Sequence, residues 1–292
     1  MAALVVSLRP DQWTKNLIVF AGLIFGQRLL DATALGAAIW AFVIFCGLSS
    51  AMYLVNDLVD RNEDRRHPVK RTRPIASGAL SSGSAMTWAI VLVVVSLSAS
   101  FSLSWTLGVV SVTFVGLLTA YSRLLKHLVI LDVLAIAAGF VIRAIGGAVA
   151  VDVPISQWLL VCTLLLALFL GLSKRRHELV LLGNLATEHR RSLGQYSPQL
   201  FDQLISVVAA ATLVSYAFYT VEPSTVENFG TNKLTWTLPF PIYGIFRYLY
   251  LVHREQGGGN PAEMLLSDRP LLACVALWVV AIVLIIYRPL VG

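Results

Sequence analysis

Oxygen-bearing side chains recur at helical spacing between residues 56 and 64. Asn56, Asp60 and Asp64 are four residues apart, so a helix with 3.6 residues per turn places them along one face, with Asp57 close to Asp64. Three carboxylates so close together repel one another unless a cation lies between them. Hard oxygen ligands suit Mg²⁺, which combines a few carboxylates with phosphate oxygens of a substrate. The pattern predicts a Mg²⁺ site formed by these four residues, in preference to a solvated helix end.

A basic segment follows the acidic one directly. Pro68 disfavours a helical conformation at His67 and is expected to end the helix there. The basic side chains beyond it could hold phosphate groups that the metal does not reach. The side chains expected in this role are those of Lys70, Arg71 and Arg73. Arg65 and Arg66 fit ordinary solvated positive charge instead.

The composition predicts that membrane helices position these residues. The chain has 292 residues, of which 57% are hydrophobic and 13% are charged, whereas soluble domains carry roughly 25% charged residues. Apolar runs of about 20 residues recur along the chain, which is the length that crosses a bilayer. The basic residues are not interleaved with aromatic ones, which argues against nucleic acid as a partner. We therefore expect an all-α, polytopic membrane protein that has the lipid bilayer as its surroundings.

The apolar runs predict nine transmembrane helices in a single domain that covers residues 1–292. The expected ranges are 17–30, 34–55, 85–104, 106–121, 129–150, 157–174, 203–221, 235–251 and 271–288. Only Leu103–Leu107 separates the third helix from the fourth. A surface helix and turn are expected over 179–201. Gly22 and Gly26, and the pair Gly146–Gly147, indicate close helix packing.

The lysines and arginines predict the orientation of the chain. If the N-terminus is cytoplasmic, all but four of the 22 lie in the cytoplasmic segments. The four exceptions are Arg28, Arg143, Lys233 and Arg288. Cytoplasmic loops of membrane proteins carry an excess of basic residues. The distribution therefore predicts a cytoplasmic N-terminus and places the polar clusters on the cytoplasmic side.

The acidic segment resembles a known family. N-D-x-x-D-x-x-x-D followed by H-P-x-K-R-x-R-P-I is similar to the first aspartate-rich motif of the UbiA-type membrane prenyltransferase superfamily. The continuation H-P-x-K-R-x-R-P-I-A-x-G more narrowly resembles the phosphoribosyl branch of that superfamily. L-R-P-x-Q-W-x-K-N near the N-terminus, which contains Gln12 and Lys15, resembles the same branch. The resemblance implies a UbiA-like helix bundle in the cell membrane, with active-site loops that face the cytoplasm.

A second polar cluster surrounds the expected connection between the fourth and fifth helices. Tyr121 and Lys126 resemble the tyrosine–lysine motif of the superfamily's second cytoplasmic loop, and Asp132 begins the next helix. Arg143 lies further along that helix, where a charge within the bilayer is costly. It is about 16 Å from Asp132 along the axis, so the two do not pair within one helix. Arg143 is therefore expected to meet another helix, a polar cavity or a ligand phosphate.

A third cluster departs from the pattern of the superfamily. Most members carry a second aspartate-rich motif between the sixth and seventh helices, whereas this chain has K-R-R-H-E-L, which matches the phosphoribosyl branch. The exchange of carboxylates for cations suggests one metal site and a second phosphate site at Lys174 and Arg175. Glu178 is expected either to complete a metal shell or to bind a ribose hydroxyl group. Arg190 and Arg191 fit solvated positive charge.

The resemblance implies transfer of the 5-phosphoribosyl group from 5-phosphoribosyl-1-diphosphate to a polyprenyl phosphate such as decaprenyl phosphate, with release of diphosphate. The product would be a lipid-linked pentose precursor for cell-wall glycan such as arabinan. One alternative is prenyl transfer from a prenyl diphosphate to an aromatic acceptor, against which the missing second aspartate motif argues. The other is an anion transporter, but the two halves of the chain show no clear repeat. The sequence leaves open whether the chain forms a homo-oligomer.

Three groups of residues are expected to carry the phosphoribosyl reaction. The catalytic group would stabilise the leaving diphosphate and comprises Asp57, Asp60, Asp64, Lys70, Arg73 and Lys126. The substrate-binding group comprises Gln12, Lys15, Asn56, His67, Arg71, Tyr121, Asp132, Arg143, Lys174, Arg175 and Glu178. The metal group, for Mg²⁺, comprises Asn56, Asp57, Asp60 and Asp64. Because the oxygen of a prenyl phosphate is already anionic, no strong general base is expected.

Overall fold

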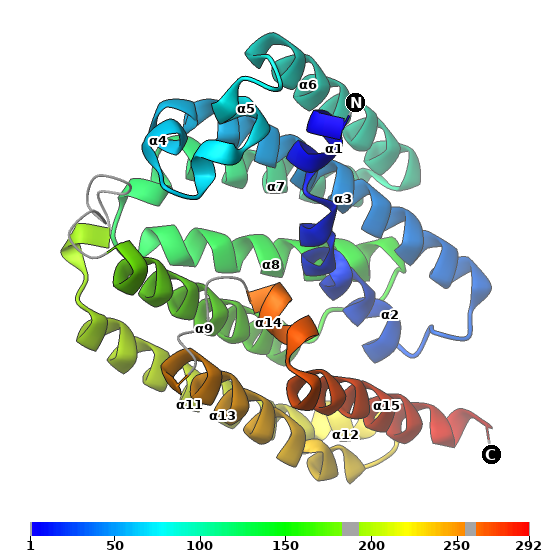
Figure 1. The fold of residues 1–292 in the computed structure, drawn as a ribbon. Coiled ribbons are helices and arrows are strands. Elements are labelled where there is room, and N and C mark those ends of the chain that lie inside the picture. The colour runs from blue at the N-terminus through cyan, green and yellow to red at the C-terminus, as the bar shows by residue number, and fades with distance from the viewer. Residues whose placement is uncertain (1, 183–192, 255–260, 292) are drawn as a thin grey trace. The chain divides into compact units, whose positions relative to one another are not determined.

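The computed structural model describes residues 2–182, 193–254 and 261–291. Over these ranges the chain is helical and contains no strand. The helices are drawn in Figure 1, and the chain divides into two compact units. Of the described residues, 2–154 form unit 1, and 155–182, 193–254 and 261–291 form unit 2. The single domain predicted for residues 1–292 stays a prediction. Arg190 and Arg191 lie outside the described residues.

Unit 1 consists of long helices joined by short ones. Its elements are α1 (Ala2–Leu8), η1 (Pro10–Phe20), α2 (Ala21–Phe25), α3 (Ala32–Val59), α4 (Arg61–Arg66), η2 (Lys70–Thr72), α5 (Pro74–Ser77), α6 (Ser82–Leu103), α7 (Trp105–Arg123), η3 (Leu125–His127) and α8 (Leu131–Ala150). Helix α3 packs against η1, α6, α7 and α8. It is therefore the central element of the unit.

Side-chain caps define where these helices begin. The Asp31 carboxylate accepts hydrogen bonds from the backbone N–H groups of Thr33 and Ala34 at the start of α3, at 2.9 and 3.2 Å. The Ser104 hydroxyl accepts one from the backbone N–H of Leu107 at 3.0 Å. Such caps satisfy donors that the first turn of a helix leaves without a partner. Ser104 therefore confirms the predicted separation of the third helix from the fourth.

The first predicted helix is not continuous. Residues 17–30 include the end of the 3-10 helix η1, the five-residue α2 and a turn. Here the backbone of α8 comes very close to those of η1 and α2. A Cβ atom placed on Gly147 of α8 would lie 1.9 Å from the carbonyl oxygen of Val19, and one placed on Gly22 would lie 2.6 Å from the Cα of Ala148. Glycine at these positions confirms the predicted close packing.

The core of unit 1 lies where α3, α7 and η1 meet. The fully buried side chains include Val19, Phe45, Leu48, Leu107 and Phe114. The rings of Phe45 and Phe114 contact edge to face, with centroids 5.3 Å apart and planes at 83°. This is a favourable geometry for two aromatic side chains. This core packs against the middle of α3, ahead of the C-terminal end of the helix, where Asp57 lies.

Unit 2 contains three long helices and several short elements. They are α9 (Gln157–Leu182), η5 (Leu193–Gln195), α11 (Pro198–Val221), α12 (Pro223–Phe229), η6 (Lys233–Thr237), α13 (Pro239–Arg254), α14 (Pro261–Ser267) and α15 (Arg269–Val291). Helix α9 packs along α11. The Tyr216 hydroxyl of α11 lies 2.6 Å from the hydroxyl of Thr237 and accepts a hydrogen bond from Trp278 of α15 at 2.9 Å. One buried tyrosine thus links three elements of the unit.

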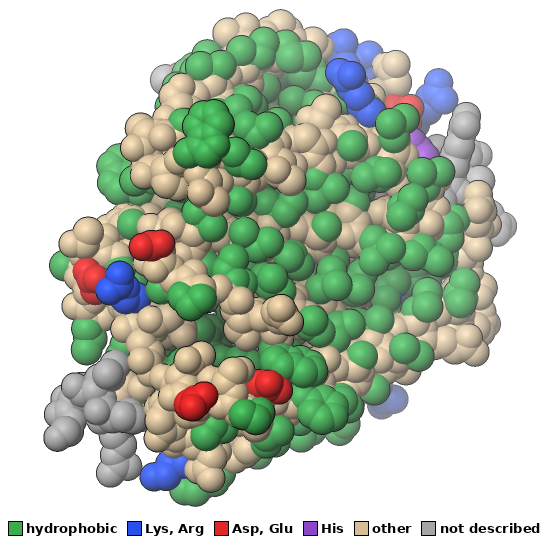
Figure 2. All heavy atoms as spheres, turned by 180° about the vertical axis from the view of Figure 1, so that it is seen from behind, with side chains coloured by type: hydrophobic (Ala, Val, Ile, Leu, Met, Phe, Trp, Pro, Cys, Tyr) green, Lys and Arg blue, Asp and Glu red, His purple; other side chains and the backbone are tan. Residues whose placement is uncertain are grey.

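Seven helices of the described chain are long and apolar enough to cross a membrane. They are Ala32–Val59, Ser82–Leu103, Trp105–Arg123, Leu131–Ala150, Gln157–Leu182, Pro198–Val221 and Arg269–Tyr287. The first predicted span is divided between η1 and α2, and α13, in place of the eighth, has 16 residues, against about 20 for a full crossing. Large hydrophobic side chains such as Trp40, Val95 and Leu284 are exposed, and apolar side chains cover much of the surface in Figure 2. A lipid environment accounts for that surface.

Candidate active site

The acidic residues lie where α3 ends. The helix stops at Val59, and Asp60 has φ −88° and ψ 8° before α4 begins. Backbone hydrogen bonds nevertheless continue at helical spacing, from Asp60 N–H to Asn56 O at 2.9 Å and from Asp64 N–H to Asp60 O at 2.8 Å. The Asn56 amide donates to an Asp60 carboxylate oxygen at 3.1 Å. The side chains of this segment are therefore close to one another, as their spacing predicted.

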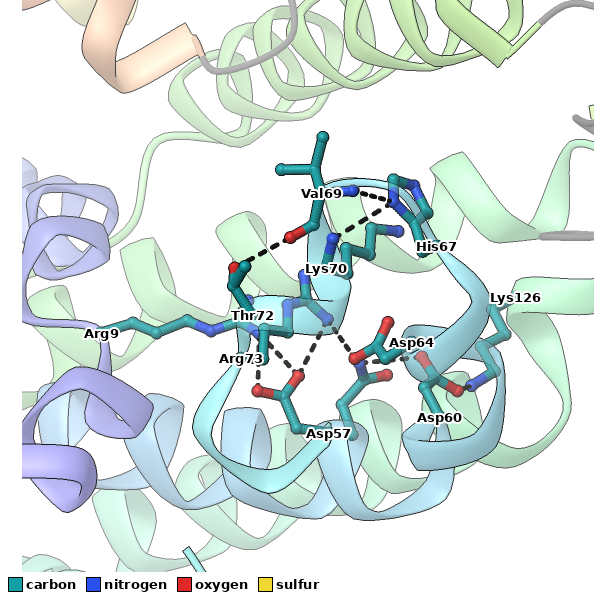
Figure 3. A network of polar contacts seen from close by, with 11 residues as sticks. Arg9, Asp57, Asp60, Asp64, His67, Val69, Lys70, Thr72, Arg73 and Lys126 are labelled. Carbon is teal, nitrogen blue, oxygen red and sulfur yellow. Dashed lines mark hydrogen bonds and ion pairs between the residues drawn. The ribbon is translucent and has the colours of Figure 1, made fainter. Parts of the chain in front are cut away.

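Two arginines bind the buried carboxylates (Figure 3). Asp57 is 2% exposed. One terminal nitrogen of Arg9 lies 2.6 and 2.8 Å from its two oxygens. One terminal nitrogen of Arg73 lies 3.1 Å from Asp57 Oδ1 and 2.7 Å from Asp64 Oδ2. Arg73 therefore bridges the two carboxylates that the sequence placed on one face.

A lysine distant in sequence completes the network. Lys126 belongs to η3, after α7, and its ammonium group forms an ion pair with Asp60. It is buried, with 3% exposed. The network thus contains three carboxylates and three cations, all within unit 1. These six side chains, called the charge network below, are Arg9, Asp57, Asp60, Asp64, Arg73 and Lys126.

The side chain of His67 stabilises the turn after α4, and this turn brings Arg73 back to the carboxylates. Pro68 follows the end of α4, and His67 is extended, with φ −77° and ψ 133°. The Nδ1 atom of His67 accepts hydrogen bonds from the backbone N–H groups of Val69 and Lys70, at 3.1 and 3.2 Å (Figure 3). The predicted end of the helix before Pro68 is confirmed. Arg65 is exposed, and its Nε donates to Ala76 O at 2.9 Å, which braces the same turn.

The charges of the network are balanced inside the protein. Burial raises the pKa of Asp64 above its ordinary value, and the nearby Arg73 guanidinium opposes that shift. The guanidinium of Arg73 lies within hydrogen-bond distance of both Asp57 and Asp64. Its positive charge therefore offsets the repulsion between the two carboxylates. Among the residues described, no three acidic, histidine or cysteine side chains converge as a preformed metal site. The donor oxygens expected for Mg²⁺ are present, but internal cations hold them.

Several predicted substrate-binding residues lie elsewhere in unit 1. Gln12 and Lys15 are in η1, and the Gln12 amide donates to Asp11. Tyr121 lies in the last turns of α7 and Arg71 is exposed in η2. Asp132 is fully buried in the first turn of α8. Their assignment to substrate binding stays a prediction.

Arg143 meets neighbouring helices. Its guanidinium donates to the Asn16 side-chain oxygen at 2.7 Å, the Gly139 carbonyl at 3.1 Å and the Ser49 hydroxyl at 3.2 Å. The guanidinium carbon lies 4.6 Å from the centre of the Phe114 ring. Of the three environments expected for it, these contacts correspond to another helix, because they join η1, α3 and α8. Its predicted role in substrate binding stays a prediction.

The cations of α9 belong to unit 2. Arg175 is buried and forms an ion pair with Glu178 one turn later, while Lys174 is partly exposed. The neighbouring Arg176 donates to Asp202 of α11 at 2.5 Å. Helix α9 continues to Leu182, beyond the predicted end at residue 174. The expected surface helix over 179–201 therefore begins as part of α9, and residues 183–192 lie outside the described chain.

Three residues around the charge network were missed by sequence reasoning. The sequence predicts Arg9 as a cytoplasmic charge and Trp13 as a membrane-interface anchor, both within the L-R-P-x-Q-W-x-K-N motif, and it assigns no role to Ser50. The motif L-R-P-x-Q-W-x-K-N was the available signal. It could not indicate that Arg9 contacts Asp57, which is 48 residues away.

Comparison with known proteins agrees with this architecture. The model of the UbiA prenyltransferase family matches residues 16–267. The chain belongs to the UbiA prenyltransferase family. A decaprenyl-phosphate phosphoribosyltransferase of Corynebacterium glutamicum is 35% identical, over 97% of this chain and 86% of that protein. The protein of the same name from Mycolicibacterium smegmatis is 34% identical, over 98% of this chain and 93% of its own length.

A solved structure of the family shares the fold. A UbiA homolog from Archaeoglobus fulgidus, bound to GPP and Mg²⁺, superimposes with a TM-score of 0.75 at 17% identity, and the match covers 97% of this chain and 99% of that one. The UbiA fold expected from the motifs is confirmed. Within this UbiA protein, the acidic motif lies at the C-terminal end of α3, surrounded by the cations of the charge network.

Proposed function

We propose that this UbiA protein transfers the 5-phosphoribosyl group from 5-phosphoribosyl-1-diphosphate to a polyprenyl phosphate and releases diphosphate. The charge network carries the proposal, because it holds three cations against three carboxylates at the end of a membrane helix. Relatives that align with 97–98% of the chain and are named for this activity support the choice of substrates. The product would be a lipid-linked pentose precursor for cell-wall glycan.

We propose Mg²⁺ as the cofactor. Asp57, Asp60 and Asp64, with the amide oxygen of Asn56, supply the hard oxygen donors that Mg²⁺ prefers. Bound there, the ion would neutralise charge on the leaving diphosphate. The guanidinium of Arg73 lies between two of these carboxylates, on Asp57 Oδ1 and Asp64 Oδ2, so an ion that took either of these oxygens would displace Arg73 from that carboxylate. The anionic diphosphate offers a new partner for the displaced cation.

The protein's own cations would then hold the diphosphate. Arg73 reaches the carboxylates from the residue after η2, and Lys126 reaches them from η3. Lys70 begins η2, three residues before Arg73. Cations positioned before the reaction stabilise charge that develops as the bond at the anomeric carbon breaks. The oxygen of the prenyl phosphate attacks without a strong base because it is already anionic.

We place the protein in the cell membrane with nine spans, a cytoplasmic N-terminus and a cytoplasmic active site. The positive-inside distribution of lysine and arginine supports this orientation. Seven long apolar helices support a multi-pass arrangement. Cytoplasmic access suits a water-soluble diphosphate donor, while the bilayer supplies the polyprenyl acceptor.

Two parallel assays on the purified protein in detergent with Mg²⁺ test the function. One offers ribose-labelled 5-phosphoribosyl-1-diphosphate with decaprenyl phosphate, and the other offers a prenyl diphosphate with 4-hydroxybenzoate. We expect ribose label in an organic-extractable lipid, and its loss when EDTA removes the metal. Activity only in the second assay would overturn the proposal in favour of an aromatic prenyltransferase. Inactivity in both assays would also contradict the proposal and would favour the alternative hypothesis of an anion transporter.

Replacing Lys126 with glutamine is expected to reduce phosphoribosyl transfer by about 10- to 100-fold, the value of one hydrogen bond to a charged group. The buried ammonium group would no longer balance Asp60 or reach a phosphate. The measurement is kcat/KM in the ribose-label assay. Arg123→Gln is the matched control, because Arg123 is an exposed cation three residues earlier. Equal losses in both variants would mean that only general positive charge matters.

A further inference from the structure

Arg9 has an unusual backbone conformation. It lies between α1 and η1 with φ 53° and ψ 61°, in the left-handed region. Side chains other than glycine, asparagine and aspartate adopt this region rarely. Such conformations persist where the surrounding structure enforces them, and they are concentrated at functional sites. The contacts on either side of Arg9 therefore need an explanation.

A single hydroxyl group of α3 anchors both sides of Arg9. Ser50 is buried, and its Oγ donates a hydrogen bond to the carbonyl oxygen of Leu8 at 2.9 Å. The same Oγ accepts a hydrogen bond from Trp13 Nε1 at 3.0 Å. Pro10 follows Arg9 and fixes the start of η1. The segment that carries Arg9 is thus attached to α3 two turns before Asp57.

This anchoring directs the Arg9 side chain at Asp57. One terminal nitrogen contacts both carboxylate oxygens, at 2.6 and 2.8 Å. The guanidinium carbon lies 5.0 Å from the centre of the Tyr53 ring, one turn earlier on α3. Arg9 retains 23% exposure whereas Asp57 has 2%. The arginine is therefore partly open to solvent while it covers a buried carboxylate.

The balance of charge suggests what Arg9 does when a ligand arrives. Three cations already neutralise Asp57, Asp60 and Asp64. A divalent ion that binds these carboxylates would leave surplus positive charge unless a cation turns to another anion. A diphosphate supplies that anion, and a guanidinium is well suited to bind phosphate oxygens. Arg9 is the partly exposed cation on Asp57 that does not also bridge Asp64.

We propose that Arg9 is a further substrate-binding residue, which occupies the cation position at Asp57 in the ligand-free protein and turns to the diphosphate when metal and diphosphate bind together. Ser50 and Trp13 are the positioning residues that keep Arg9 within reach of both partners. The proposal deepens the proposed function and rests on its diphosphate site. It predicts opposite effects of Arg9 on the binding of the metal alone and on the binding of the diphosphate.

The test uses Arg9→Gln in the full-length protein in detergent. Mn²⁺ binding without diphosphate is measured by electron paramagnetic resonance, and binding of ³²P-labelled inorganic diphosphate at saturating Mg²⁺ is measured by equilibrium dialysis. We expect tighter Mn²⁺ binding, because Asp57 loses a competing cation. We expect diphosphate binding to weaken about tenfold or more, the value of a hydrogen bond to a charged group. Arg28→Gln, at an ion pair with Asp31, should change neither.

The opposite directions of the two changes in affinity distinguish a ligand-binding role of Arg9 from a purely structural one. If Arg9→Gln weakens both ligands alike, or leaves diphosphate binding unchanged, the proposal is wrong. Ser50→Ala keeps every charge and loosens the anchor, so it should give smaller shifts of the same signs, and it carries the test if Arg9→Gln does not fold. If Arg9→Gln changes the Mn²⁺ and diphosphate affinities in opposite directions but the protein transfers no phosphoribosyl group, the role of Arg9 is supported and the proposed function is rejected.

Discussion

Replacing Asp57 with asparagine is expected to reduce phosphoribosyl transfer by at least about 100-fold, the scale on which one preorganised electrostatic group contributes to catalysis. Asp57 is the most connected carboxylate of the charge network, since it binds both Arg9 and Arg73. The amide keeps the shape of the side chain but removes the charge that would hold Mg²⁺ and orient both arginines. The measurement is kcat/KM in the ribose-label assay, together with the melting temperature.

Glu63→Gln is the matched control for this substitution. Glu63 lies in α4 between the acidic residues, is exposed, and undergoes the same loss of one negative charge. It should keep nearly full activity. A loss of activity as large in Glu63→Gln as in Asp57→Asn would show that the net charge of the segment matters and the buried geometry of Asp57 does not.

Replacing Gly147 with alanine is expected to be the most damaging small substitution for folding. The new Cβ would lie 1.9 Å from the carbonyl oxygen of Val19 and 2.8 Å from its Cα. These are backbone atoms, so no side-chain rotation relieves the contact, and α8 and η1 have to separate. Overpacking of this kind costs about 1–3 kcal/mol and occasionally more. The expected result is a melting temperature lower by several degrees, measured by thermal unfolding in detergent.

Gly116→Ala provides the comparison within the same unit. Gly116 lies inside α7, and nothing is within 4 Å of its added Cβ. Alanine there should be neutral or stabilising by up to about 1 kcal/mol, because glycine is the poorer helix former. If Gly147→Ala melted no lower than Gly116→Ala, the close approach of α8 to η1 would not be required for stability.

The UbiA fold could be predicted in large part because its signals are local. Runs of about 20 apolar residues mark spans, and seven of them are long apolar helices. The first predicted span proved to be 3-10 helix followed by a short α-helix. Its close packing against α8 constrains this backbone, and hydrophobicity alone does not reveal that constraint.

The sequence by itself determined the acidic face, because the helical repeat places Asn56, Asp60 and Asp64 together, and Pro68 ends the segment. Only the tertiary structure decided which cations meet those carboxylates. Arg9 and Asp57 are 48 residues apart, and Lys126 and Asp60 are 66 apart. Arg143 reaches Asn16 across 127 residues. Such pairs depend on how α3, η1 and α8 pack, whereas sequence periodicity reports only which residues share a face of one helix.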